Sequence, residues 1–314
     1  MSNSVTSVDL PNTHTVRVTQ RSAPFAVTFW GVRAHIPTPG LSTAYYGGNT
    51  ACVEVQLGEH RLIFDGGTGL RVLGESLLAA VPPLSSLSKN ETANAITGIS
   101  GHLFFTHARS DCIQGFPFFK PAFNPRNQFH VYGASAANGA SIKQCLTTQM
   151  LRPNSPVPFH QMAADFTFHD IFAGQVISLG NSRVETLTTN SQTGALGYRI
   201  TRQDRSLVYA PDIDYATMGS ALARWAHCAD LMICGSASTA YPVTRSGTSN
   251  YRPVHDWQTA IDLIQSTQIK QAIFSGFSPD QTDRSLNGFA QTLKPIKPRI
   301  SLAREGLQIQ LDTA

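Results

Sequence analysis

The sequence predicts an α/β (α+β) protein in which two strand-rich halves, each with flanking helices, pack as a four-layer αββα sandwich. Three observations predict this class. Short apolar runs typical of buried strands recur in both halves, segments with helical spacing follow several of them, and no internal repeat of solenoid type is present. With 314 residues, of which 41% are hydrophobic, the chain is long enough for one large core.

The first half is expected to begin at Phe25. Residues 1–24 are polar, rich in Ser and Thr and without period, which is typical of a flexible tail. Residues 82–100 contain few hydrophobic side chains and many turn formers, so they predict a surface insertion within a single domain spanning 25–314. Strands are predicted over 26–30, 51–57, 62–64, 103–105 and 129–132, and helices over 70–81 and 137–150.

The second half repeats this alternation of strands and helices, interrupted by a long loop over 235–256. Its helices are predicted over 215–228, 257–265 and 283–293. Its strands are predicted over 184–187, 196–200, 206–209, 231–234 and 272–274, with a final pair near Ile300 and Leu307.

Composition describes an ordinary globular protein with a lightly charged surface. The formal net charge is only +4 and the basic residues are scattered along the chain, so nucleic acid is not an expected partner. Charged residues make up 14% of the chain, which suggests either a modest solvated surface or a surface partly covered by a partner.

The five cysteines form no C-x-x-C pair, and the N-terminus carries no apolar export segment. These features predict reduced thiols and a cytoplasmic location. No run of about 18 apolar residues exists, so no membrane span is expected.

The most informative stretch is HLFFTHARSDCIQGFPFF, residues 102–119. It begins as a buried strand and then breaks into a loop that carries His107, Arg109, Asp111 and Cys112. A loop of ionisable residues at the end of a buried strand is a common place for functional groups, because the strand fixes their positions.

This stretch resembles the metal-binding motif of the metallo-β-lactamase fold superfamily, T-H-x-H-x-D-H. The continuation, I-x-G-F-P-F-F, is similar to the superfamily's phosphodiesterase and ribonuclease Z-like branch. The segments GVRAHIPTPG, YYGGNTACVEV and FDGGTGLRVLG also resemble that branch in order and spacing. The resemblance implies the αββα sandwich, hydrolysis of phosphodiesters at a metal centre, and frequent dimerisation.

The resemblance also assigns the family's seven metal-ligand positions to residues of this chain, and the assignment departs from the family pattern. Arginine cannot ligate a metal, and glycine offers no side chain. The resemblance therefore implies a catalytically inactive protein without a bound metal or other cofactor. The seven positions are His107, Arg109, Asp111, Cys112, Ser191, Asp212 and Gly276, and Asp65 stands at a position that supports the site from behind the ligands. A further histidine of the branch aligns with Val254, one residue before His255.

An emptied site would leave two carboxylates, Asp111 and Asp212, close together with nothing to neutralise them. Arg109 projects from the same loop, and its guanidinium matches a carboxylate in a forked pair. We expect Arg109 to replace the metal structurally.

The resulting functional hypothesis is binding, in a structural, scaffolding or regulatory role. The expected partner is another protein, a second copy of the chain, or a small phosphorylated ligand in a basic cleft formed by Arg33, Arg109, Lys120 and Arg126. One alternative is a phosphodiesterase-type hydrolase with one zinc or manganese ion on His107, Asp111, Cys112 and Asp212. A second alternative is RNA binding without cleavage.

The segment 116–123, FPFFKPAF, has two interpretations. Packing in the core is favoured, and an exposed aromatic patch for a partner chain is the alternative. The glycine-rich turn 65–69 lacks the third glycine of a dinucleotide-binding loop, and neither a Walker loop nor a G-x-S-x-G elbow is present.

Overall fold

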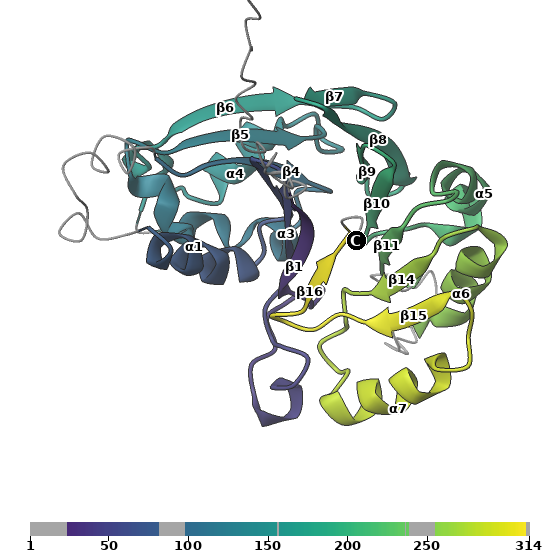
Figure 1. Ribbon diagram of the computed structural model, residues 1–314. Coiled ribbons are helices and arrows are strands. Elements are labelled where there is room, and N and C mark those ends of the chain that lie inside the picture. The colour runs from purple at the N-terminus through teal and green to yellow at the C-terminus, as the bar shows by residue number, and fades with distance from the viewer. Residues whose placement is uncertain (1–23, 82–97, 156, 236, 239–254, 312–314) are drawn as a thin grey trace, which may run out of the picture.

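A computed structural model describes residues 24–81, 98–155, 157–235, 237–238 and 255–311. Within these ranges two seven-stranded sheets face each other, and helices cover the outer side of each sheet (Figure 1). The predicted four-layer αββα sandwich is confirmed. Residues 1–23 and 82–97, and so nearly all of the predicted tail and insertion, lie outside the described residues.

The first sheet has the order β16-β1-β2-β3-β4-β5-β6. Strands β3 to β6 run parallel, and β1 pairs with β2 and with β16 antiparallel. The C-terminal strand β16 thus returns to the first half of the chain. The bounds are β1 Phe25–Gly31, β2 Cys52–Leu57, β3 His60–Phe64, β4 Ser100–Phe105, β5 Gln128–Gly133, β6 Asp165–Asp170 and β16 Gln308–Gln310.

The second sheet has the order β15-β14-β11-β10-β9-β8-β7, with β10, β11, β14 and β15 parallel. Its bounds are β7 Val176–Leu179, β8 Ser182–Asn190, β9 Ala195–Arg202, β10 Arg205–Ala210, β11 Leu231–Cys234, β14 Gln271–Phe274 and β15 Arg299–Leu302. Strands β12 Ala237–Ser238 and β13 His255–Asp256 form a separate pair.

Helices α1 and α4 lie outside the first sheet, and α5, α6 and α7 lie outside the second (Figure 1). The short helix α3 follows β4. The bounds are α1 Gly69–Ala79, α3 Ser110–Ile113, α4 Ile142–Thr148, α5 Tyr215–Trp225, α6 Trp257–Ser266 and α7 Asp283–Leu293, with 3-10 turns η1 Leu41–Thr43, η3 Phe116–Phe118, η4 Lys120–Phe123 and η5 Phe159–Gln161.

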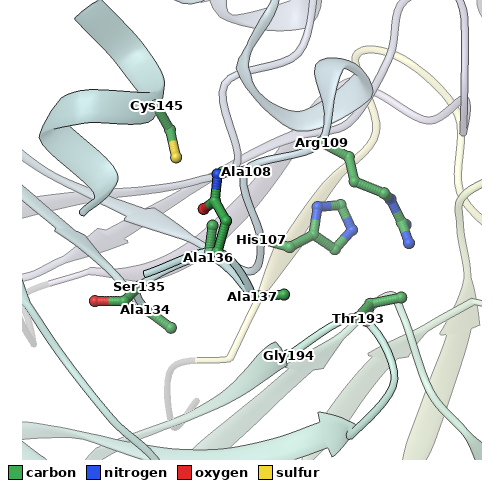
Figure 2. Close-up of a pocket in the computed structure, with 11 residues that line it drawn as sticks. His107, Ala108, Arg109, Ala134, Ser135, Ala136, Ala137, Cys145, Thr193 and Gly194 are labelled. Atoms are coloured by element: carbon green, nitrogen blue, oxygen red, sulfur yellow. The ribbon is translucent and has the colours of Figure 1, made fainter. Parts of the chain in front are cut away.

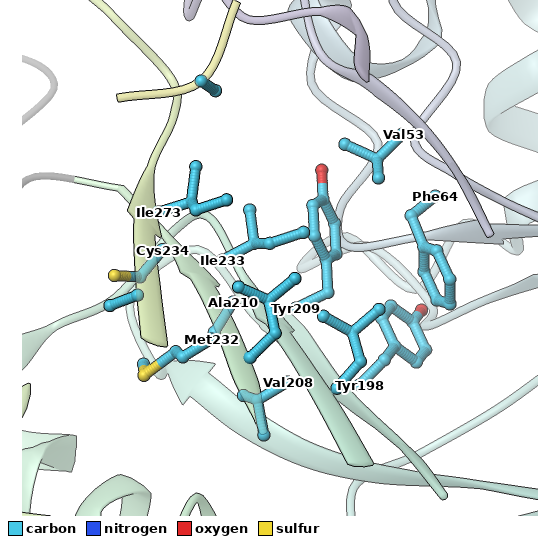
Figure 3. Packing of buried hydrophobic residues seen from close by; sticks show 14 of the residues in the cluster. Val53, Phe64, Tyr198, Val208, Tyr209, Ala210, Met232, Ile233, Cys234 and Ile273 are labelled. Atoms are coloured by element: carbon cyan, nitrogen blue, oxygen red, sulfur yellow. The ribbon is translucent and has the colours of Figure 1, made fainter. Parts of the chain in front are cut away.

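Strand alternation produces two hydrophobic clusters. One face of the first sheet packs with the second sheet, where Val53, Phe64, Tyr198 and Ile233 are buried (Figure 3). The other face packs under α1 and α4 through residues such as Leu103. Neighbouring residues of a strand point to opposite faces, so a central strand packs on both sides. The loops at the strand ends therefore start from fixed positions between two packed layers.

Several predicted boundaries need correction. The helix predicted over 137–150 is shorter, because Ser141 caps it in a capping box with Gln144 and begins α4 at Ile142. Strands β6 and β7 were not predicted, because these neighbouring edge strands are only half buried and carry polar residues. The insertion predicted to reach residue 100 ends earlier, since β4 begins at Ser100.

The segment 116–123 divides between the two interpretations. Phe116 and Phe119 are fully buried in the cluster under α1, which confirms core packing for these rings. Phe118 and Phe123 are 61% and 37% exposed. Among the helices of the described residues, none is both long and apolar enough to cross a membrane.

Four histidines form a row across adjacent strands of the first sheet: His60 on β3, His102 on β4, His130 on β5 and His169 on β6. Neighbouring ring centroids lie 5.7, 5.2 and 5.5 Å apart along this row. Nδ1 of His130 lies 3.2 Å from Nε2 of His169. Burial, and then the neighbouring imidazoles, lower the pKa of His102 to about 4.

We expect acid to destabilise the protein because unfolding allows His102 to become protonated. The folded state keeps His102 neutral, whereas the unfolded chain takes up the proton near pH 6.5, so stability is lost as pH falls from about 6.5 towards 4. Between pH 7 and 5, wild type is expected to lose about 1 kcal/mol more than His102→Gln, after allowance for solvent screening. Urea unfolding at the two pH values measures this difference, and equal losses in both proteins would contradict it.

Candidate functional site

The candidate site lies where loops follow the carboxyl ends of parallel strands from both sheets. His107 to Cys112 follow β4, Asp212 follows β10 and Gly276 follows β14. Loops at this position meet at one edge of the sheets, as in other α/β proteins. Of the seven predicted positions, six line one cavity of about 50 Å³: His107, Arg109, Asp111, Cys112, Asp212 and Gly276.

Arg109 lies between the two carboxylates. Its Nη1 is 3.0 Å from Oδ2 of Asp212, and its Nε is 3.7 Å from Oδ1 of Asp111. Burial alone would lower the pKa of Arg109, but the charges of Asp212 and Asp111 outweigh it and raise that pKa. The expected pairing of Arg109 with the site carboxylates is therefore present.

Asp111 is buried, which on its own would raise its pKa. His107, Arg109 and the backbone N–H of His35, which donates to Asp111 Oδ2 at 3.1 Å, together lower that pKa. The carboxylate is thus held ionised by protein groups alone.

Asp212 is held by neighbours that the sequence did not single out. Asn190 Nδ2 donates to its Oδ1 at 3.0 Å, and Thr193 Oγ1 donates to its Oδ2 at 3.0 Å. Ser191, the predicted fifth position, lies exposed in the turn between them and does not line the cavity. The resemblance marked the correct turn, but the turn presents Asn190 and Thr193 to Asp212 because backbone N–H groups of the turn bind Asn190 Oδ1.

His107 and Cys112 form the inner wall. His107 Nε2 lies 3.6 Å from Asp212 Oδ2 and 3.9 Å from Cys112 Sγ. His107 Nδ1 is buried, with no hydrogen-bond partner among the described residues. Burial, then the charges of Asp65 and Asp111, raise the pKa of the Cys112 thiol well above its usual value, so the thiol is neutral and a poor nucleophile.

Asp65 supports the loop from behind, at the position that the resemblance implied. It has a left-handed φ of 60° and accepts hydrogen bonds from Thr106 N–H at 2.8 Å and Tyr209 O–H at 2.8 Å. Thr106 directly precedes His107, so these bonds fix where the loop leaves β4. Burial raises the pKa of Asp65, and the bonds to its ionised form oppose that rise.

Arg33 is fully buried and joins two loops beside the cavity. Its Nε donates to the Gly47 carbonyl at 2.7 Å, and its Nη1 donates to the carbonyls of Ser278 at 3.2 Å and Gln281 at 2.6 Å. From the sequence, Arg33 was predicted to belong to a basic cleft that binds a phosphorylated ligand.

The predicted four-residue basic cleft is not formed. Arg33 and Arg109 line the same cavity, but Lys120 pairs with Glu75 of α1 at 3.0 Å and Arg126 is exposed elsewhere. Arg33 Nε and Nη1 donate to backbone carbonyls, while its buried Nη2 has no hydrogen-bond partner among the described residues, so Arg33 mainly joins loops.

A second cavity of about 410 Å³ opens on the other side of His107 and Arg109. Figure 2 shows His107 and Arg109 on one side of this cavity and Ala134, Ser135, Ala136 and Ala137 on another, with Cys145 of α4 and Thr193 also at its border. Most of the lining side chains are small and uncharged. A volume of this size accepts a small molecule, whereas the 50 Å³ cavity has room for little more than water.

The residues present do not fit a dinuclear metal centre. Arg109 and Gly276 offer no ligand atom, Ser191 is exposed, and Arg109 already pairs with the remaining carboxylates. A smaller donor set does exist, since ligand atoms of His107, Asp111 and Cys112 lie within 4.8 Å of one another.

A family model described as "Beta-lactamase superfamily domain" matches residues 60–277. The chain belongs to this superfamily. The resemblance inferred from the motifs is confirmed, and the fold of this beta-lactamase superfamily protein is the metallo-β-lactamase sandwich. No curated protein sequence matches it significantly.

Solved structures agree on the fold. The metallo-beta-lactamase fold protein YhfI from Bacillus subtilis is 16% identical with a TM-score of 0.60, covering 92% of this chain and 99% of that one. A diphosphatase from the PhnP family is 15% identical with a TM-score of 0.58, covering 92% and 98%. The short form of human tRNase Z is 15% identical with a TM-score of 0.57, covering 92% and 100%. At these identities the similarity establishes the fold.

Proposed function

We propose that this superfamily member is catalytically inactive and acts by binding, in a structural, scaffolding or regulatory role. The observation that carries the proposal is the position of Arg109 between Asp111 and Asp212. The positively charged Arg109 occupies a position that, by the family resemblance, corresponds to a metal ligand. Arginine remains protonated under all physiological conditions, so it neutralises the carboxylates without a metal.

The ligand that best suits the 410 Å³ cavity is a small molecule with a phosphate or similar anionic group. Arg109 lines this cavity and its side chain is 33% exposed, so it can offer its positive charge to an anionic group of the ligand. The names of two structural neighbours, a diphosphatase and tRNase Z, support a phosphorylated ligand.

A protein is the other kind of partner that is compatible with the proposed binding role. Phe118 and Phe123 are both exposed on the segment 116–123. Either a second copy of the chain or a different protein could cover these two rings. All five cysteines are free, which supports a cytoplasmic setting for either partner.

A hydrolase with one metal ion is the second candidate, favoured by the cluster of His107, Asp111 and Cys112. His107 Nε2 and Cys112 Sγ are 3.9 Å apart. Nitrogen and sulfur ligands of one tetrahedral zinc ion are about 3.6 Å apart, so the pair is close to a binding distance. Zinc or manganese would supply Lewis-acid chemistry on a phosphodiester. Asp212 would complete the set only after Arg109 released it.

Hydrolysis of bis(p-nitrophenyl) phosphate distinguishes the two candidates. With added zinc or manganese, wild type is expected to show no rate above that of Asp111→Asn, because Arg109 occupies the carboxylates. Calorimetry is expected to detect binding of inorganic phosphate to wild type. The Arg109→Gln variant is expected to bind phosphate about tenfold more weakly. A metal-dependent rate that Asp111→Asn abolishes would instead establish the hydrolase.

A further inference from the structure

A third cavity is separate from the candidate site. It has a volume of about 610 Å³ and shares no lining residue with the two cavities beside Arg109. It lies between the loop that carries Tyr45, the end of α7 and the edge strand β15. Figure 1 shows α7 beside β15 at this edge of the second sheet.

Four basic side chains line this groove: Lys294, Lys297, Arg299 and Arg304. All four are exposed, and no acidic side chain lines the groove with them. Within the described part of the chain, none of the four takes part in an ion pair. Cations gathered without counter-charges repel one another, so the arrangement favours an anionic ligand.

Two carboxylates on segments next to the groove, Glu305 and Asp283, form hydrogen bonds to other parts of the chain. Glu305 accepts from Asn49 N–H at 2.7 Å and from Asn49 Nδ2 at 3.0 Å. Asp283 accepts from the backbone N–H groups of Tyr45 at 2.8 Å and Tyr46 at 3.2 Å. The Asp283 bonds hold the backbone of the two tyrosines, and among the described residues neither carboxylate forms an ion pair with a cation of the groove.

The groove also offers an aromatic surface. Tyr45 is 56% exposed, and the Arg304 guanidinium lies 5.6 Å from its ring centroid. Three of the cations lie on the short segment Lys294-Pro295-Ile296-Lys297-Pro298-Arg299, where the prolines restrict the backbone. Less backbone conformational entropy is then lost when this segment binds a ligand.

We propose that this groove binds single-stranded nucleic acid, with the four cations contacting phosphates and Tyr45 stacking on a base. Proteins that bind single strands without sequence preference combine a cationic groove with exposed aromatic rings in this way. An acidic peptide would use the cations but not the exposed ring of Tyr45, whereas a single strand would use both, and a membrane surface is distinguished from a single strand by the experiment below. The groove does not involve Arg109, so the inference is independent of the proposed function.

Fluorescence anisotropy with a labelled 12-nucleotide RNA of mixed sequence tests the proposal on the full chain. Lys294→Gln combined with Lys297→Gln is expected to weaken binding about tenfold at low salt and to reduce the salt slope by about 1.4, from two lost phosphate contacts on a single strand. The matched control, Arg126→Gln with Arg224→Gln, removes two exposed charges outside the groove and is expected to bind as wild type does.

Stacking is tested separately. Tyr45→Ala is expected to weaken binding about tenfold with an unchanged salt slope, while Tyr45→Phe retains wild-type affinity. Absence of binding by wild type at low salt would overturn the proposal, as would equal losses in the groove and control variants. Capture by phosphatidylserine vesicles without RNA binding would also overturn it, because the groove would then serve a membrane surface.

Discussion

Replacing Arg33 by methionine is expected to lower the free energy of unfolding by about 4 kcal/mol. The side chain is fully buried and binds the carbonyls of Gly47, Ser278 and Gln281, which lie in loops on both sides of the candidate site. Methionine fills much of the same space but donates no hydrogen bond. Three carbonyls would lose a buried partner, each at a cost of about 1 to 3 kcal/mol, partly offset by relaxation and water.

Urea unfolding followed by circular dichroism measures the loss. Arg61→Met is the matched control, because Arg61 pairs with Glu54 at 2.8 Å near the surface. That variant is expected to lose less than about 1 kcal/mol. If Arg33→Met were no less stable than the control, the buried arginine would have no structural role in joining the loops.

Replacing Arg109 by alanine is expected to lower the free energy of unfolding by about 2 kcal/mol. Removing one partner of a buried ion pair costs about 3 to 5 kcal/mol, and the partial exposure of Arg109 reduces that figure. The variant leaves Asp111 and Asp212 without the cation that lies 3.7 and 3.0 Å from them. Lysine restores the charge but has a single nitrogen in place of the two that approach Asp111 and Asp212, so the stability of Arg109→Lys is expected to lie between those of wild type and Arg109→Ala.

The matched control is Lys120→Ala, which breaks an exposed 3.0 Å pair with Glu75 and is expected to change stability by less than about 0.5 kcal/mol. Both variants are measured by the same urea unfolding. Equal stability of Arg109→Ala and wild type would show that the carboxylates do not need this cation.

The sequence was sufficient for the fold because its buried strands are apolar and its loops carry a recognisable order of motifs. Strand β11 is a continuous apolar run and strand β4 ends in one, and such runs remain identifiable without tertiary contacts. Edge strands β6 and β7 pack on one side only, so their alternation contains polar residues and was missed. Helix α4 was predicted too long because Ser141, inside the predicted range, was not recognised as its N-cap.

Site residues could be predicted where they follow a strand at a fixed spacing. They could not be predicted where the conformation of a turn determines which side chain reaches the site. Arg109 follows β4 by a fixed number of residues, so its approach to Asp111 and Asp212 was predictable. Ser191 was misplaced because the turn after β8 directs Thr193 towards Asp212. The basic groove was not predictable, since Tyr45 and Lys294 are brought together only by the completed sandwich.

Elemental analysis of purified, untagged protein, after growth with added zinc and manganese, tests directly whether Arg109 replaces a metal. Wild type is expected to contain less than about 0.1 equivalent of metal, and Arg109→His, which frees both carboxylates and adds a ligand, is expected to approach about one equivalent. About one equivalent in wild type, lost in Asp111→Asn and in Cys112→Ser, would contradict the account and establish a metal-dependent hydrolase.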